Sequence, residues 1–381
     1  TNFQLPASEV ILGDGDGGYG RRPHFTAPAS AASRVGDVDL DGRPDIVRVT
    51  PQLGLETMFW SDGQLAVFPE QPFGVAPLLI RVADATGDGA PDVVAVASGG
   101  GVYVAEGVPG RPGAFALPEA VPLTGLGAGR VLNDLRPGCA ASAPGVLCGY
   151  ATDPAAYHAV IVALDAAGKG QAFESGAVDV NQVFTVPAWA DLDGDGLEDA
   201  TLVAYTPDGS DALLQTSRTS LSGASTWQLG AWTPVPGGAL GGGLTFADSA
   251  GTTKGAGTKR RLVYFAYTGV PEEFLLVLVS DAGATKIPLL ANYGASNFPT
   301  RGFVADFDGD GRDDVVLADR RGVLRFHAGL ADGTFSGTPY LTWIGLGTLS
   351  AALPGTGGKS DLLFVSGEQY LIAKNKGDGT F

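Results

Sequence analysis

The chain has 381 residues and a formal net charge of −17, and it contains 58 glycines and 25 prolines. An acidic chain without basic clusters lacks the electrostatic footprint for nucleic acid or anionic membranes. The longest apolar run, at residues 274–279, is far too short to span a bilayer and is expected to be a buried strand. We therefore expect no nucleic acid partner and no membrane insertion.

The first predicted element is a hairpin-like segment at residues 9–19, which includes Gly-Asp-Gly-Asp-Gly at 13–17. This acidic stretch lacks the full ligand spacing of the loops that follow, so a hairpin tip is the expected structure.

Four nine-residue stretches, starting at Asp37, Asp84, Asp191 and Asp306, then repeat one aspartate-spaced pattern. Positions 1, 3, 5 and 9 carry side-chain oxygens, position 6 is glycine, and position 7 offers a backbone carbonyl, which together suit Ca²⁺. We predict about four Ca²⁺ ions with a mainly structural role, and Thr86 makes the second site the weakest. The predicted ligands are Asp37, Asp39, Asp41, Arg43 and Asp45; Asp84, Thr86, Asp88, Ala90 and Asp92; Asp191, Asp193, Asp195, Leu197 and Asp199; and Asp306, Asp308, Asp310, Arg312 and Asp314.

The loops are not EF-hands, because the last acid stands at position 9 and runs rich in β-branched residues follow it, such as 46–49 and 93–96. Each loop is expected to end in a strand. A single copy could be a solvated Asp/Gly turn, but four copies with the same offsets make that interpretation improbable.

The spacing of the copies indicates repeats of about fifty residues. Asp37 and Asp84 are 47 residues apart, and the steps from Asp191 through a weaker copy at Asp248 to Asp306 are 57 and 58. Further decayed copies lie near 134 and 353, which makes seven repeats. Gly/Asp turns before an aromatic residue add a hairpin to several repeats, as at 332–335 and 378–381. Four antiparallel strands per repeat form a propeller blade.

Seven repeats with this aspartate loop and a Gly-Asp-Gly-Thr-Phe turn at 377–381 resemble the FG-GAP/VCBS repeats of integrin α-subunit propellers and of many bacterial secreted proteins. The resemblance covers essentially the whole chain. It implies an all-β fold, a seven-bladed β-propeller of four-stranded antiparallel blades, in one domain over residues 1–381. We expect the N-terminal strand to complete the last blade and close the ring.

Two cysteines, Cys139 and Cys148, lie in the third repeat, where the aspartate loop has decayed. A disulfide would hold that loop in place of an ion; the alternative is two buried free thiols. Calcium sites and a disulfide both indicate an oxidising compartment, so the protein is expected to be secreted or on the cell surface, in an extracellular or periplasmic setting. The start at Thr1 without a signal peptide suggests a mature or trimmed chain.

The loops after the second strand of repeats three to five open with related tyrosines and are longer than those of other repeats. They could present aromatic rings and hydroxyls to a glycan or a protein; the alternative is that the tyrosines pack between blades. The candidate ligand-binding residues are Tyr150, Thr152, Asp153, Tyr205, Thr206, Asp208, Tyr267 and Thr268.

No nucleophile or phosphate-binding motif occurs, and the histidines are scattered, so the sequence names no catalytic residue and favours a role without catalysis. The preferred interpretation is a calcium-stabilised binding or adhesion module, lectin-like in use, for a glycan or a protein. Two alternatives stay open: a polysaccharide lyase or dehydratase on a propeller scaffold, as the resemblance allows, and an architectural part of a larger surface or toxin protein.

Overall fold

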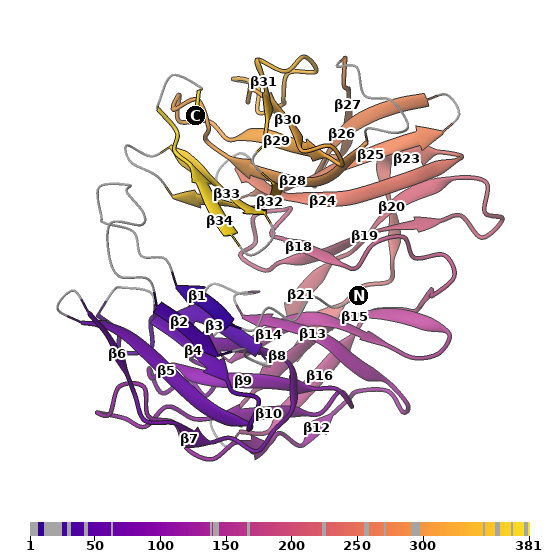
Figure 1. Ribbon diagram of the computed structural model, residues 1–381. Helices are drawn as coiled ribbons and strands as arrows, with labels where there is room; N and C mark the ends of the chain where they lie inside the picture. The colour runs from indigo at the N-terminus through magenta and orange to yellow at the C-terminus, as the bar shows by residue number, and fades with distance from the viewer. Residues whose placement is uncertain are drawn as a thin grey trace. The chain divides into compact units, whose positions relative to one another are not determined.

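The computed structural model describes residues 7–10, 25–28, 32–41, 45–61, 64–137, 139, 145–165, 168–222, 226–254, 259–269, 272–290, 298–345, 347–354, 359–366, 369–376 and 380–381. Every regular element in these ranges is a β-strand. The strands form seven successive, mainly antiparallel sheets of three or more strands, in chain order (Figure 1). The predicted fold class is therefore confirmed: the chain is all-β and a seven-bladed β-propeller.

The chain divides into two compact units, and the first comprises residues 1–10, 24–181 and 217–232. It holds three blades. The first is β3 (Ala32–Gly36), β4 (Asp45–Val49), β5 (Gly54–Ser61) and β6 (Gln64–Val67), with β7 (Gln71–Pro72) beside β5; the second is β8 (Pro77–Ala83), β9 (Asp92–Ala97), β10 (Val102–Ala105) and β11 (Glu119–Ala120); the third is β13 (Val131–Pro137), β14 (Val146–Thr152), β15 (Ala156–Leu164) and β16 (Gly170–Glu174), with β12 (Leu123–Thr124) and β17 (Val178–Asp179) at its edges.

Two further hairpins belong to this unit, β1 (Ala7–Val10) with β2 (Phe25–Pro28), and β21 (Thr219–Ser222) with β22 (Thr226–Leu229). The expected partner of the N-terminal strand was the last blade. Among the described pairings, β1 lies antiparallel to β2.

The second unit comprises residues 11–23, 182–216 and 233–381. It holds four blades. They are β18 (Ala188–Ala190), β19 (Asp199–Tyr205), β20 (Ala212–Ser217) and β23 (Thr233–Gly241); β24 (Leu244–Lys254), β25 (Arg260–Gly269), β26 (Glu272–Ser280) and β27 (Gly283–Pro288); β28 (Pro299–Ala305), β29 (Asp314–Asp319), β30 (Val323–His327) and β31 (Leu341–Ile344); and β32 (Thr348–Pro354), β33 (Ser360–Ser366) and β34 (Gln369–Ala373).

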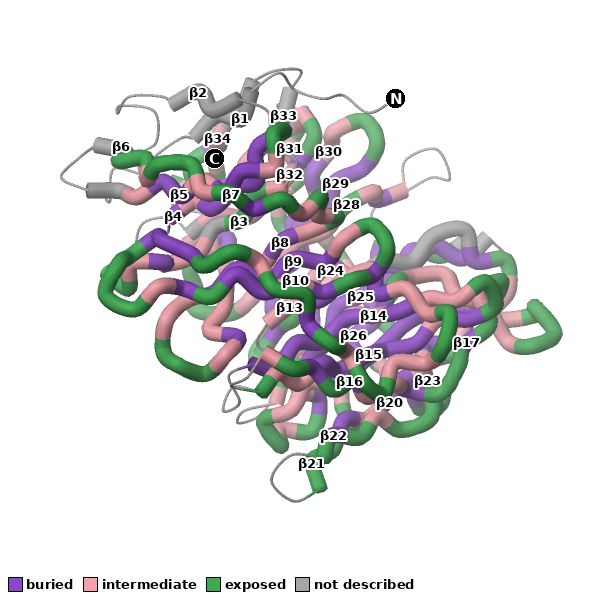
Figure 2. Tube along the Cα trace, turned by 90° about the horizontal axis from the view of Figure 1, so that it is seen from below, coloured by how far each residue is buried: buried purple, intermediate pink, exposed green. Residues whose placement is uncertain are grey.

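The second strand of a blade is its most buried element. All six residues of β29 are buried, and so are the first five of β9. Such strands need apolar side chains on both faces, which explains why their sequences read as continuous runs and not as alternating ones. The hydrophobic clusters join neighbouring blades within a unit; one cluster combines Val94 of β9 with Leu147 of β14. Figure 2 shows buried residues along the strands and exposed ones at the turns.

The three decayed copies begin inside first strands. Asp134, Asp248 and Leu353 are all inside first strands, where they pair with Tyr150, Phe265 and Asp361. The connections to the second strands follow where β13, β24 and β32 end, at Pro137, Lys254 and Pro354. The first strand of each of these blades therefore includes the first residues of the decayed copy.

Candidate metal centres on the aspartate loops

Each intact aspartate loop joins the first strand of a blade to the second. The four loops connect β3 to β4, β8 to β9, β18 to β19 and β28 to β29, and the aspartate at position 9 is the first residue of the second strand in every case. The predicted strand–loop–strand arrangement is thus confirmed. Because neighbouring strands are antiparallel, the two loops within each unit occupy equivalent ends of their sheets.

The carboxylate at position 1 organises the turn in three of the loops. One oxygen of Asp84, Asp191 or Asp306 accepts the N–H of position 4 at 2.6–2.7 Å, and the other accepts the N–H of position 6 at 2.9–3.1 Å. Both donors are glycines with positive φ, which residues with a Cβ rarely adopt. These backbone hydrogen bonds fix the orientation of the first acid in the three loops.

The carboxylates at positions 3 and 5 are held in the same way. In the sixth blade, Asp308 accepts the N–H of Asp310 at 3.0 Å, and Asp310 accepts the N–H of Arg312 at 2.8 Å. The fourth blade repeats both bonds, at 3.2 Å and 2.8 Å. Ligands that are already oriented lose less entropy when they bind an ion.

The carboxylate at position 9 is buried and ties the loop to a distant hairpin. Asp92 and Asp314 are both 0% exposed. One oxygen of each accepts N–H groups at positions 2 and 3 of its own loop, at 2.8–3.1 Å. The other accepts the N–H of Gly107 or Gly329, beyond the third strand, at 2.8 Å. The sequence predicts position 9 as an ion ligand but does not predict this second bond.

The same bond recurs where no aspartate loop is present. In the last blade, buried Asp361 accepts the N–H of Asn375 at 2.8 Å. Asp361 lies in β33 at the place that Asp314 has in β29. This buried aspartate is thus a structural part of the blade itself.

Three triads of carboxylates have ligand oxygens within 4.8 Å of one another. They are Asp37 with Asp39 and Asp41, Asp191 with Asp193 and Asp195, and Asp306 with Asp308 and Asp314. Clustered carboxylate oxygens are the donor set that Ca²⁺ prefers, so the residues present fit such an ion. The second loop has Thr86 at position 3, whose hydroxyl donates to Asp92 at 3.2 Å and so competes with a role as ligand.

Burial and mutual repulsion raise carboxyl pKa values in these loops. Burial raises the pKa of Asp314 to about 6, with a further contribution from the charge of Asp308. Burial also raises the pKa of Asp45, and Asp39 and Asp41 add to the effect. The ionised forms of Asp314 and Asp45 are therefore less favoured than those of a solvated carboxyl, and a divalent cation would relieve that cost.

Two of the predicted ligands, Arg43 and Asp310, differ from the others. Arg43, the carbonyl ligand of the first loop, lies outside the described residues. Asp310 forms an ion pair with Arg312, so in the sixth blade the triad draws on position 9 in place of position 5. The other carbonyl residues, Ala90 and Leu197, are both at turn positions whose N–H groups bond to the carboxylate of position 5 at 2.8 Å.

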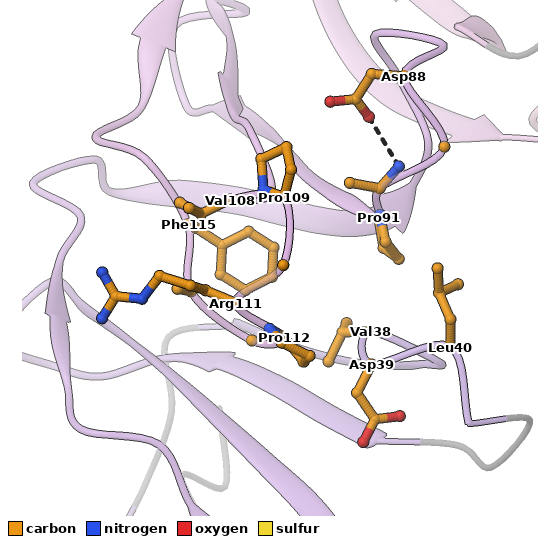
Figure 3. Close-up of a pocket in the computed structure, with 16 residues that line it drawn as sticks. Val38, Asp39, Leu40, Asp88, Pro91, Val108, Pro109, Arg111, Pro112 and Phe115 are labelled. Atoms are coloured by element: carbon orange, nitrogen blue, oxygen red, sulfur yellow. Dashed lines mark hydrogen bonds between the residues drawn. The ribbon is translucent and has the colours of Figure 1, made fainter.

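A pocket of about 240 Å³ lies between the first two loops, in the first unit. Figure 3 shows Leu40 on one side and Asp88 and Pro91 on another, with Pro109, Pro112 and Phe115 of the hairpin after β10 completing the wall. A pocket of about 190 Å³ in the second unit is built from the corresponding parts of the fifth and sixth blades, including 311–313 and 329–335. The pockets are a repeated consequence of the loop–hairpin contact.

The three tyrosines predicted as ligand anchors are packed to different degrees. Tyr267 is 5% exposed and stacks on Phe274 with 4.5 Å between ring centroids. Its ring is therefore packed in the core, in agreement with the alternative that the tyrosines have a packing role. Tyr205 is half-buried, meets Phe184 edge-on and donates to the carbonyl of Leu244 at 3.2 Å. Tyr150, also half-buried, stacks on Tyr157.

Their polar neighbours stabilise turns. Asp153 accepts the N–H groups of Ala155 and Ala156, both at 2.8 Å. Asp208 accepts bonds from Thr206 and Ser210, which lower its pKa to about 2. Thr152 accepts from the Asn133 amide at 2.8 Å, and Thr268 is 4% exposed. Tyr150 belongs to the first unit, and Tyr205 and Tyr267 belong to the second.

The predicted disulfide between Cys139 and Cys148 is confirmed, with Cα atoms 5.8 Å apart. Cys139 follows β13 and Cys148 lies in β14, so the bridge closes the connection between the first and second strands of the third blade. In four other blades an aspartate loop occupies this place.

No family model matches this sequence. No curated protein matches it either. Two solved structures resemble the fold: BBS1N in complex with ARL6DN, at 14% identity and a TM-score of 0.45 over 92% of this chain and 93% of that one, and a putative 6-phosphogluconolactonase from Bacteroides fragilis, at 13% identity and a TM-score of 0.44 over 88% and 95%. No helix that could cross a membrane occurs among the described residues.

Proposed function

We propose that this propeller is a calcium-stabilised binding module of the FG-GAP/VCBS type, secreted or displayed at a cell surface. The observation that carries the calcium part is the set of three carboxylate triads, each with ligand oxygens within 4.8 Å. In water such a group of like charges would spread apart, whereas here the backbone N–H groups of the turn hold the acids together.

The ion would supply the positive charge that the loop lacks. The carboxylates at positions 1, 3, 5 and 9 would hold it, and the N–H bonds to position 1 keep the first ligand in place before binding. Position 9 connects the loop to the hairpin after the third strand in the second and sixth blades. Occupancy is therefore expected to stabilise three strands of a blade together, beyond the loop alone.

The test is calorimetric titration of Ca²⁺ into chelator-treated protein, followed by thermal unfolding with and without the ion. We expect three or four ions per chain and a higher melting temperature with calcium. Asp193→Asn should remove one ion, since Asp193 contributes to the triad of the fourth blade. Asp165→Asn is the matched control, because Asp165 lies in an ordinary turn and accepts the N–H of Lys169. An unchanged melting curve with calcium would reject the proposal.

For the partner, we infer a glycan or a protein, recognised at the loops of the propeller rims, where rigid scaffolds commonly carry their binding residues. Screening the chain on a glycan array, with calcium and with chelator, tests this part separately. Calcium-dependent binding to a defined glycan would support a lectin-like role. Stability that responds to calcium while no glycan binds would favour a protein partner.

A further inference from the structure

A pocket of about 390 Å³ lies at the strand ends opposite the Asp306 loop. Within this blade, Ala305 pairs with Asp314 next to the loop, whereas Pro299 pairs with Asp319 at the far ends of β28 and β29. The pocket is bounded by the start of β28, the turn between β29 and β30, and the segment that leads into β32. All of these parts belong to the second unit.

Three exposed arginines, Arg301, Arg320 and Arg321, line this pocket. Arg301 donates to the carbonyl of Leu349 at 3.3 Å, and the guanidinium of Arg320 lies 4.2 Å from the ring centroid of Phe298. These contacts restrict the two side chains but leave their charges uncompensated, because neither a carbonyl nor an aromatic ring is an anion.

Asp319 is the acidic residue in the pocket lining, and hydrogen bonds from other residues, including Arg325, already stabilise its carboxylate. One oxygen accepts the N–H groups of Arg321 and Val323 at 2.9 Å and 3.0 Å, and the other accepts from Arg325 at 3.1 Å. Asp319 is only 5% exposed. In the described part of the chain, Arg301, Arg320 and Arg321 form no salt bridge, so their positive charges gather in a protein whose net charge is −17.

We propose that this pocket binds an oxyanion group, a carboxylate, sulfate or phosphate, carried by a small polar ligand. Guanidinium groups present paired N–H donors that match the two oxygens of such an anion. The pocket volume suits a molecule of about the size of a sugar ring, which is larger than a bare ion. Thr300 and Thr348 add hydroxyl groups to the lining for the uncharged part. The proposal does not depend on calcium.

Calorimetric titration with glucuronate, sulfate and inorganic phosphate, each at low ionic strength, tests the proposal, with glucose as the neutral counterpart of glucuronate. We expect one-to-one binding of at least one oxyanion and no binding of glucose. The preferred anion identifies the carboxylate, sulfate or phosphate source. Arg320→Gln with Arg321→Gln should weaken that binding about tenfold to a hundredfold, since it removes charge-assisted hydrogen bonds.

Arg111→Gln is the matched control, because Arg111 is exposed and lies in the first unit, outside this pocket. It should leave the affinity unchanged. Arg321→Lys, which keeps the charge but loses the paired donors, should fall between wild type and Arg321→Gln. Thermal unfolding of each variant confirms folding. The proposal is overturned if none of the three anions binds at ~10 mM, or if Arg111→Gln weakens binding as much as the pocket variants.

Discussion

Backbone conformation, and not side-chain chemistry, determines which residue suits position 4 of the aspartate loops. Gly87, Gly194 and Gly309 have φ values of 77°, 85° and 83° there, and Leu40 takes the same place in the first loop with φ 61°. A side chain with a Cβ in this region costs roughly 1–2 kcal/mol. Leu40 is 64% exposed, so it recovers little of that cost by burial.

Replacing Leu40 by glycine is therefore expected to stabilise the protein. The relief of backbone strain outweighs the greater freedom of glycine in the unfolded chain, and the net gain should be ~0.5–1 kcal/mol in the free energy of unfolding. Chemical denaturation measures it. Leu117→Gly serves as control, because Leu117 is 66% exposed and has no positive φ, and this change should destabilise. A loss of stability in Leu40→Gly would contradict the strain argument.

His327 is the residue from which we expect a response to pH. It is 0% exposed and its Nδ1 lies 2.9 Å from the carbonyl oxygen of Ser336. Burial lowers the pKa of His327 to about 4. Its pKa in an unfolded chain is about 6.5, so the unfolded state binds the proton more readily, and the contribution of His327 to stability must fall as the pH drops from about 6.5 towards 4.

His327→Gln should flatten this dependence. The imidazole contributes a loss on the order of 3 kcal/mol across that range, and glutamine can still donate to Ser336 but does not titrate. Unfolding free energies at several pH values between 4 and 8, with calcium held constant, provide the measurement. Equal slopes for the variant and the wild type would show that other groups cause the acid sensitivity.

Sequence spacing predicts residues of the loops well because an aspartate loop is local: its hydrogen bonds join residues at most seven apart. The bonds from Gly107 to Asp92 and from Gly329 to Asp314 cross 15 residues and depend on where the third strand ends. No local sequence pattern predicts where the third strand ends. The role of position 9 in the blade could therefore be found only in the structure.

At the scale of strands, the aspartate at position 9 marks the start of the second strand in all four intact repeats, as the sequence predicts. In the decayed repeats the end of the first strand is harder to predict, because without the aspartate motif only the length of that strand determines where the connection begins. β24, for example, has 11 residues and includes Asp248. The tyrosines show a related ambiguity, since an aromatic residue near a strand end can pack inward or face a ligand.

Tyr267 in β25 is expected to matter for stability. Tyr267→Ala removes a ring that is 5% exposed and stacked on Phe274, and it should cost about 3–5 kcal/mol, as other large-to-small changes in a core do. Tyr267→Phe keeps the ring and should cost far less. Thermal or chemical unfolding separates the two variants. Wild-type stability of Tyr267→Ala would show that the ring contributes little to the core.

The disulfide between Cys139 and Cys148 restrains a short connection in the third blade. Replacing both cysteines by serine should lower the free energy of unfolding by ~2.7 kcal/mol on the chain-entropy model, given a sequence separation of nine residues. Comparing the double variant with the wild type, each with and without reductant, provides the test. Reductant should destabilise the wild type alone, and a variant as stable as the oxidised wild type would contradict this account.

At the scale of the whole chain, the charge and the proposed ions are linked. Four Ca²⁺ ions would bring the formal charge from −17 to −9. A smaller negative charge reduces self-repulsion, which favours the compact state, and it also slows the migration of the protein towards the anode. Native electrophoretic mobility should therefore fall on adding calcium and recover with chelator, whereas Asp165→Asn should respond as the wild type does. Identical mobility in calcium and in chelator would exclude the binding of several ions.

The connection between the first and second strands of a blade is stabilised in different ways in different blades. In four blades it holds an acidic loop and in the third a covalent bridge, whereas in the last blade Asp361 keeps its bond to Asn375 without an intact aspartate loop before it. Because the connection joins the same two strands in every blade, its sequence can be transplanted: if the proposed ion binds, residues 191–199 grafted between β13 and β14 would exchange redox dependence for cation dependence in a single blade.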